Sequence, residues 1–310
     1  MRSVSTRARV GALGAFTALT TVMAIGTATA QTQLNGNWAP FSRCPVDNPT
    51  MLAADGVNDS ALCVSSHSAS GSIKLGNTTV PTGASDLQIG VVTHPGGTST
   101  LVSPAEGALV ADSANLPGGL LGLMCPSNIP VVSGICNQIT NVSLNKVTAT
   151  IESVNSPSDF QLLAGTTTGK PIVTLPVRIH LENPFLGSNC YIGSSSNPIV
   201  LRPQNLTRPA PSTEAFNGDG TPDPTGPLGR INLIGANQGD STFAVPGASG
   251  CGLGLLDWAV NLKTGLPAAS GTNSVTLNSA ATYVATINDP TSVAPDQGKV
   301  LSQYWHSAAK

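Results

Sequence analysis

The chain has 310 residues, of which only 10% are charged and 4% aromatic, and it contains 33 glycines and 24 prolines. The scarcity of charge excludes a coiled coil, and the many helix-breaking residues argue against a bundle of long helices. A hydrophobic content of 40% excludes a fully disordered chain.

Residues 1–30 have the pattern of a secretory signal peptide. Three arginines among the first nine residues precede an uncharged, mostly apolar run from Val10 to Ile25. Ala28-Thr29-Ala30 then fits the small-x-small rule for cleavage before Gln31. A retained membrane anchor is the alternative, but the run contains three threonines and is shorter than the ~20 apolar residues that cross a bilayer. We therefore expect a secreted mature chain, extracellular or associated with the cell wall, with no integral membrane span.

Removal of this segment changes the charge balance. The mature chain would carry 11 basic and 16 acidic residues, a net charge of −5, with the basic residues scattered singly. Nucleic-acid binding needs clustered cations that displace counterions from phosphate, and a polybasic membrane patch needs the same clustering. We therefore expect no nucleic-acid partner.

All six cysteines lie in the mature chain, and an even number in an exported protein favours disulfides. Zinc is the competing interpretation, but the chain has no C-x-x-C motif and no cluster of cysteine with histidine. Short loops close at the lowest entropic cost. We therefore expect the pairs Cys44–Cys63, Cys125–Cys136 and Cys190–Cys251.

Runs in which every second residue is apolar predict several β-strands. These runs cover residues 86–94, 142–154, 175–181, 274–277 and 282–287. A bulge is expected near Asn145-Lys146, and Pro176 favours an edge strand or a bulge. The last two runs are expected to form a hairpin around Asn278-Ser279. Turn residues separate most of the runs. The pattern predicts a mainly β fold: an antiparallel sandwich or distorted barrel with one or two short helices, held by disulfides.

One segment departs from the strand pattern. Gly252–Lys263 places Leu253, Leu256 and Val260 at helical spacing, and Gly265 beyond it suits a helix end. A short buried helix is expected here, with a strand as the alternative, because apolar residues also alternate in the segment. Gly118–Met124 is a second, weaker helix candidate.

A proline-rich stretch, residues 203–227, could separate two domains. Cys190 and Cys251 flank it, however, and a disulfide between them would make it a long loop within one domain. We expect residues 31–310 to form a single large β domain, or two tightly joined lobes around this loop.

Motifs of common hydrolases are missing. The G-x-S-x-G and H-E-x-x-H motifs are absent, and the four histidines, His67, His94, His180 and His306, lie far apart. Gly239-Asp240-Ser241 begins like the nucleophile loop of a serine protease, but Thr242-Phe243 follow in place of the two glycines that would free the oxyanion-hole backbone. We therefore assign no catalytic residue.

Carboxylates are the remaining source of catalytic chemistry. The mature chain has sixteen carboxylates, and a glycosidase needs only two of them close together, so such a catalytic pair is not excluded. The few aromatic residues argue against a sugar-binding site. Asp257, between Leu256 and Trp258, is the best candidate for a buried carboxylate, but a solvent-facing position on a helix is the favoured interpretation.

One string is similar to part of a calcium-binding loop. It runs from Asn217 to Asp223 and would offer oxygen ligands from Asn217, Asp219 and Asp223. The bidentate glutamate of an EF-hand is missing, and Asn-Gly and Asp-Gly are also common turn formers. An ordinary loop is therefore the favoured interpretation, with calcium at Asn217, Asp219 and Asp223 as the alternative, and we expect no other cofactor.

Three strings resemble exported, signal-peptide-bearing proteins of actinobacteria that have no assigned function. They are residues 40–47 (PFSRCPVD), 183–193 (NPFLGSNCYIG) and 265–271 (GLPAASG). The resemblance extends over most of the mature chain. It implies secretion and cysteine pairing and carries over no catalytic residue.

The function expected first is therefore a structural or binding role for a non-enzymatic protein of the cell exterior, as a cell-envelope component or a homo-oligomer. The first alternative is a secreted hydrolase whose Asp, Glu and His residues converge only in three dimensions. The second is an extracellular carrier of an apolar ligand, which would need a dry pocket of roughly 300–1,000 Å3. A structural protein would have neither a catalytic cleft nor such a pocket and would instead expose an apolar or edge-strand patch.

Overall fold

The computed structural model describes residues 32–125, 130–138 and 142–310. Residues Thr32–Lys310 form one compact unit. The predicted signal peptide and its cleavage site lie outside the described residues.

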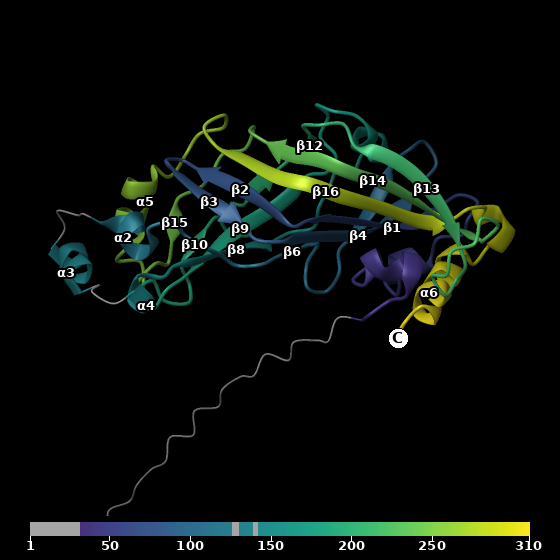
Figure 1. Cartoon of the computed structure of the whole chain (residues 1–310), viewed down its shortest axis with the longest axis horizontal. Coiled ribbons are helices and arrows are strands. Elements are labelled where there is room, and N and C mark those ends of the chain that lie inside the picture. Colours follow the sequence, from purple (N-terminus) through teal and green to yellow (C-terminus); the bar gives the residue numbers. More distant parts are fainter. Residues whose placement is uncertain (1–31, 126–129, 139–141) are drawn as a thin grey trace, which may run out of the picture. The chain divides into compact units, whose positions relative to one another are not determined.

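The described strands all belong to one antiparallel sheet (Figure 1). In chain order they are β1 (Ser60–Ser68), β2 (Ser70–Leu75), β3 (Thr78–Thr82), β4 (Ser85–Thr93), β5 (Ser99–Val102), β6 (Leu109–Ala111), β7 (Ala114–Asn115), β8 (Thr148–Ser153), β9 (Leu175–Glu182), β10 (Tyr191–Ile192), β11 (Ile199–Leu201), β12 (Gln204–Asn205), β13 (Ala210–Phe216), β14 (Leu228–Asp240), β15 (Ala248–Ser249) and β16 (Ser274–Ile287). The main path runs β12-β14-β16-β1-β4-β6-β8-β9-β10-β15, and the remaining strands pair beside it. The fold is thus mainly antiparallel β, as predicted.

Helices are more numerous than the one or two that the sequence predicts. The described residues contain α1 (Pro49–Leu52), α2 (Gly119–Met124), α3 (Pro130–Gln138), α4 (Val142–Asn145), α5 (Asp257–Thr264) and α6 (Gln297–Ser307), with the 3-10 helices η1 (Gly36–Phe41), η2 (Leu162–Thr166) and η3 (Pro290–Val293). Helices α2 to α5 lie at one end of the sheet and α6 lies at the other (Figure 1). Helix α2 matches the weaker helix prediction. No helix among residues 32–125, 130–138 and 142–310 is both long and apolar enough to cross a membrane.

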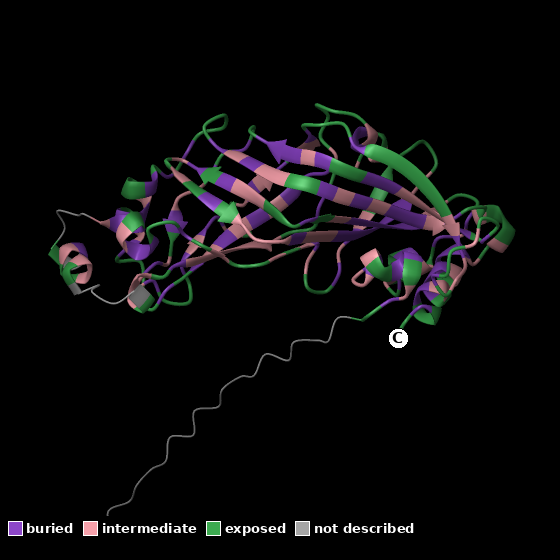
Figure 2. Ribbon diagram, in the orientation of Figure 1, coloured by how far each residue is buried: buried purple, intermediate pink, exposed green. Residues whose placement is uncertain are grey.

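Apolar side chains gather in separate cores along the sheet. The largest core packs the β2–β3 hairpin against β8 and β9 and continues under α2 and α5, which gives the sheet its sandwich-like character. A second core lies beneath η1, α1 and α6, where the ring of Trp38 packs edge-on against Phe41 and Phe216. A smaller core lies on one face of β1 and β4. Figure 2 shows the resulting bands of buried and more exposed residues along β14 and β16.

Strand β9 has the alternation that the sequence predicts, with Leu175, Val177, Ile179 and Leu181 buried. It is not an edge strand, because it lies between β8 and the strands β10 and β11. The pairing of β9 with β8 begins at Val177 and does not include Pro176. The missing N–H of Pro176 therefore removes no hydrogen bond between these two strands.

The three disulfides join the predicted pairs and leave no cysteine free. Cys44–Cys63 ties the segment after η1 to β1, and Cys125–Cys136 ties the end of α2 to α3. Cys190–Cys251 joins the start of β10 to the segment between β15 and α5.

The predicted late hairpin is wrong, because residues 274–287 form one continuous strand, β16. It pairs with β14 along its length, with register shifts between Ile234 and Gln238. Ser279 and, on the facing strand, Gly235 have positive φ angles. The turn-forming Asn278-Ser279 therefore produce an irregularity within a long strand instead of reversing the chain.

The predicted strand over residues 142–154 is only half correct. Residues 142–145 form helix α4, and β8 begins at Thr148. The side chain of Asn145 accepts a hydrogen bond from the Leu121 N–H at 2.8 Å and donates to the Gly118 carbonyl at 3.2 Å. These contacts with the distant α2 segment determine the conformation where the sequence suggested a bulge.

The proline-rich stretch 203–227 is not a linker. It contains β12 and β13, both paired with β14. The prolines therefore lie within and between strands of the same sheet.

Candidate functional site

Four large apolar side chains project into solvent between residues 253 and 262. The exposed fractions are 95% for Leu253, 77% for Leu255, 58% for Trp258 and 66% for Leu262. Five further exposed large apolar residues are spread over the rest of the described chain. These four residues lie within ten positions of one another in the chain, and we call them the apolar patch. Exposed apolar residues that gather in one region mark interaction surfaces.

The turn before α5 pushes Leu253 outward. Gly252, Leu253 and Gly254 have φ angles of 55°, 60° and 88°, so a leucine occupies left-handed backbone space between two glycines. That conformation costs a leucine about 1 kcal/mol or more. Neither burial nor backbone preference explains the position of this side chain, which makes it a candidate for function.

Helix α5 is apolar on two faces. Ala259, Val260 and Thr264 are buried on one face, whereas Trp258 and Leu262, four residues apart, are exposed on another. The helix ends at Gly265, as predicted, with a φ of 72°. Of the three residues expected on its buried face, Leu256 and Val260 are buried, but the prediction for Leu253 is wrong.

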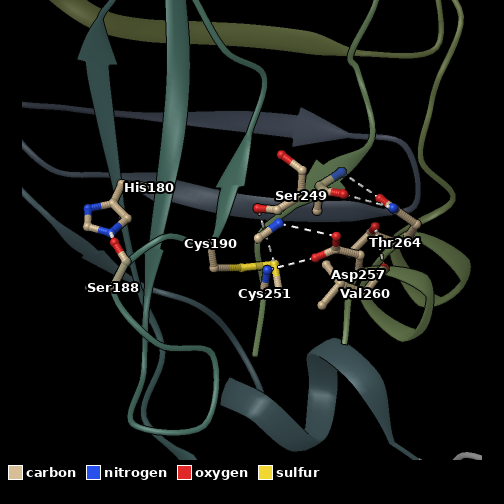
Figure 3. Close-up of a disulfide and its surroundings, with 11 residues drawn as sticks. His180, Ser188, Cys190, Ser249, Cys251, Asp257, Val260 and Thr264 are labelled. Atoms are coloured by element: carbon tan, nitrogen blue, oxygen red, sulfur yellow. Dashed lines mark hydrogen bonds between the residues drawn. A yellow bond between two sulfur atoms is a disulfide. The ribbon is translucent and has the colours of Figure 1, made fainter. Parts of the chain in front are cut away.

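Asp257 fixes the patch to the backbone beneath it (Figure 3). Its carboxylate accepts hydrogen bonds from the N–H groups of Cys251 at 2.7 Å and Gly250 at 3.1 Å. The carboxylate is half-buried, between the two positions considered from the sequence, and it has the hydrogen-bond partners that burial requires.

Asn261 and the disulfide complete this attachment. Asn261 accepts from the Ala248 N–H at 2.6 Å and donates to the Ala248 carbonyl at 3.0 Å. Cys251 is bonded to Cys190, and the Gly252 N–H donates to the Leu186 carbonyl at 2.7 Å. The apolar patch thus rests on a base held by covalent and hydrogen bonds.

Charge is scarce around the patch. Asp257 and Lys263 are the only charged residues between Ala248 and Asn273, and Lys263 is exposed. Residues 113–151, which include α2 to α4, contain a single charged residue, Lys146. Both segments are therefore poor in charge, and Glu182, which is bonded to Thr148 near Lys146, adds a negative charge at this end of the sheet.

A different arrangement surrounds His94. Its Nδ1 lies 2.7 Å from Asp59 Oδ1, and its Nε2 lies 2.8 Å from Thr100 Oγ1. The order carboxylate, imidazole, hydroxyl is the one that activates a nucleophile in many hydrolases. His94 and Thr100 lie six residues apart in the β4–β5 hairpin, whereas Asp59 precedes β1 and reaches His94 through the pairing of β1 with β4.

His180 belongs to an ion-pair network on the exposed face of β8 and β9. Its Nδ1 lies 3.4 Å from Glu152 and 3.8 Å from Glu182, and Glu152 also binds Arg178 at 2.8 Å. The ring of Tyr191 stacks on His180, with centroids 4.5 Å apart. These contacts join β8, β9 and β10 in a structural network.

The other histidines and the protease-like string have simpler surroundings. His67 is exposed on β1, and His306 binds the Asp47 carboxylate at 2.9 Å. Asp240 accepts hydrogen bonds from the Arg202 N–H and from Thr242, so it stabilises the end of β14.

The calcium-like string forms a hydrogen-bonded turn. Asp219 accepts from both the N–H and the hydroxyl of Thr221, and Asp223 accepts in the same way from Thr225. These bonds lower the pKa of both carboxyls, and Asn217 donates to the Thr221 hydroxyl at 3.3 Å. Within the part of the chain that the structure describes, no three His, Cys, Asp or Glu side chains are grouped to hold a metal. Calcium at Asn217, Asp219 and Asp223 stays a prediction.

An apolar cavity lies between the β2–β3 hairpin and β8–β9, lined by residues that include Ile73, Val80, Ile151 and Ile179. Its volume is about 30 Å3, room for about one water-sized group. Small-molecule sites usually measure about 300–1,000 Å3, so this cavity does not support the carrier hypothesis.

No known protein family matches this chain, and neither a curated protein nor a solved structure is significantly similar to it.

Proposed function

We propose that this chain is an exported, non-enzymatic binding protein of the cell exterior that attaches to its target through the apolar patch. The observation that carries the proposal is the clustering of Leu253, Leu255, Trp258 and Leu262 in solvent on a base fixed by Asp257, Asn261 and a disulfide. A rigid, exposed apolar cluster is suited to binding.

Energetic reasoning supports a binding role for the patch. Full burial of a leucine-sized side chain stabilises a folded protein by roughly 1.5–3 kcal/mol. At the four patch positions the free protein lacks most of this stabilisation, because the side chains are exposed to water. The left-handed conformation of Leu253 adds strain. A partner that covers the patch would bury these four side chains, and the free energy of that burial would favour binding.

Sequence and chemistry support the location outside the cytoplasm. Residues 1–30 have the pattern of a signal peptide, and three disulfides suit an oxidising compartment. The resemblance of residues 40–47, 183–193 and 265–271 to exported actinobacterial proteins agrees with this. A cell-wall or other envelope attachment is part of the proposal.

Co-sedimentation with the cell envelope of the producing organism tests the binding role. We define the patch variant as Leu255→Ser with Leu262→Ser, and the control variant as Val57→Ser with Leu163→Ser, at residues that are 68% and 80% exposed elsewhere on the surface. We expect the patch variant to bind at least about tenfold more weakly than the wild type, and the control variant to bind normally. Equal binding by the two variants contradicts the proposal.

A second candidate function is a hydrolase centred on His94. The observation in its favour is the relay from Asp59 through His94 to Thr100. It predicts covalent labelling of Thr100 by a fluorophosphonate, detected by mass spectrometry, and loss of labelling in His94→Gln. An unlabelled wild-type protein rules this candidate out.

A further inference from the structure

We propose that the partner of the apolar patch is a lipid bilayer, with Leu253, Leu255, Trp258 and Leu262 inserting into its interfacial region. This inference rests on the proposed binding role of the patch. It adds the chemistry of the partner, for which four properties of the site argue.

The first property is the shape of the surface at Leu253. A side chain that is 95% exposed has almost no neighbours, so it stands on a convex part of the surface. A protein partner would need a matching pocket to cover it, because protein interfaces are packed as densely as protein interiors. A fluid bilayer adapts to a convex apolar surface without a preformed pocket.

The second property is the internal hydrogen bonding of the segment. Entry into an apolar medium requires that backbone polar groups already have partners. The N–H groups of Gly254 and Leu256 donate to the Cys251 carbonyl, and that of Leu255 donates to the Gly252 carbonyl. The polar side chains of Asp257 and Asn261 bind the backbone of residues 248–251. These N–H groups and side chains can therefore enter lipid with their hydrogen bonds intact.

The third property is charge. The Asp257 carboxylate is bound to the N–H groups of Gly250 and Cys251, while Lys263, one residue beyond Leu262, is exposed. Lysine beside an apolar helix face matches the charge of anionic headgroups, and tryptophan is enriched at the level of the headgroups. Leucines, Trp258 and Lys263 thus lie in the combination found in interfacial segments.

The fourth property is the size of the patch. Taking about 200 Å2 for a large side chain, the four exposed fractions correspond to roughly 600 Å2 of surface. A standard protein interface buries about 800 Å2 on each partner, so the patch alone is small for a stable dimer. Interfacial membrane binding scales with the buried apolar area and is reversible when that area is small.

Tryptophan fluorescence gives a direct test, because Trp258 is exposed whereas Trp38 and Trp305 are buried. The full chain is mixed with vesicles of phosphatidylcholine, with and without phosphatidylglycerol. We expect a blue shift of the emission, quenching by brominated lipid, and tighter binding to the anionic vesicles. Trp258→Phe should remove both the shift and the quenching.

The patch and control variants defined above serve as matched proteins in the vesicle assay. Both retain the same N-terminal segment, so its contribution to lipid binding cancels between them. We expect at least about tenfold weaker vesicle binding by the patch variant and unchanged binding by the control variant. Equal loss in both variants, or no blue shift with either lipid, overturns the inference.

The outcomes separate this inference from the proposed function. If the patch variant loses envelope binding while the wild type does not bind vesicles, the binding role of the patch stands and the inference of a lipid partner fails. If Trp258 becomes buried only as protein concentration rises, and the mass doubles, the partner is a second copy of the chain. If envelope binding is also unaffected by the patch variant, both proposals fail.

Discussion

Asp257 lies between two apolar residues in the sequence, yet its carboxylate binds two backbone N–H groups. Hydrogen bonds to a charged group contribute about 1.5–3 kcal/mol. We therefore expect Asp257→Ala to lower the free energy of unfolding by about 2 kcal/mol in urea denaturation. Glu106→Ala, at an exposed carboxylate, is the control, and a similar loss there would contradict the assignment.

Gly235 tests the irregularity in the β14–β16 pair. Its φ angle is +83°, and no atom lies within 4 Å of the position that a Cβ would take. Gly235→Ala is therefore expected to destabilise through backbone strain alone, by about 1 kcal/mol. Gly134→Ala, also in open space but within helix α3, should have the opposite sign, since alanine favours helix. Thermal unfolding of both variants measures the difference.

Asp47 links the N-terminal segment to helix α6. Partial burial raises the pKa of Asp47, but hydrogen bonds from Ser302 and His306 and the charge of His306 outweigh it, so the pKa lies below its usual range. A lowered native pKa contributes stability above about pH 4, and this contribution is lost as the pH falls through the native value.

Asp47→Asn should therefore be less stable than the wild type at pH 6, with a difference that shrinks below about pH 4. Urea midpoints measured across the acid range provide the comparison. A difference that grows on acidification would mean that the carboxyl does not stabilise the folded state through its ionised form.

At the scale of elements, the disulfides differ in the length of the loop that they close. Cys190–Cys251 spans 61 residues, whereas Cys125–Cys136 spans 11. Chain entropy predicts contributions of about 4 and 3 kcal/mol, respectively. Cys190→Ala with Cys251→Ala should thus lower the melting temperature more than Cys125→Ala with Cys136→Ala, as calorimetry would detect. The reverse order would indicate that loop entropy does not govern these bonds.

Helix α5 combines a structural and an exposed face within eight residues. Val260 is fully buried, whereas Trp258 and Leu262 are largely exposed. The spacing of apolar residues predicts the helix but does not show which of its two apolar faces is buried, because the residues of both faces recur at the helical period. Burial was decided by the contacts of α5 with α2 and β15.

At the scale of the whole molecule, export determines whether the disulfides can form. We expect N-terminal sequencing of the protein recovered outside the cytoplasm to begin at Gln31. A thiol assay on that protein, denatured without reductant, should detect no free thiol among the six cysteines. Recovery of the uncleaved chain inside the cell, with reactive thiols, would contradict export.

Local chemistry explains what the sequence determined by itself. Alternating apolar residues predicted β4 and β9, short loop lengths predicted the disulfide pairs, and Gly265 predicted the end of α5. The strands and the helix end depend on residues within a few positions of the feature. The disulfide pairs were predicted from the order of the cysteines along the chain, which holds even for Cys190–Cys251 across 61 residues.

Only the tertiary structure decided which apolar side chains remain in solvent and which polar ones meet. Asn278-Ser279 form an irregularity because β14 pairs across them, and Leu253 stays exposed because the turn beneath it is bonded to Cys190 and Leu186. The relay of Asp59, His94 and Thr100 likewise exists only because β1 pairs with β4 and brings Asp59 to the β4–β5 hairpin. Hydrophobic periodicity and residue propensity are properties of a single segment. The exposure of a side chain depends on which other segments pack against it in the folded protein.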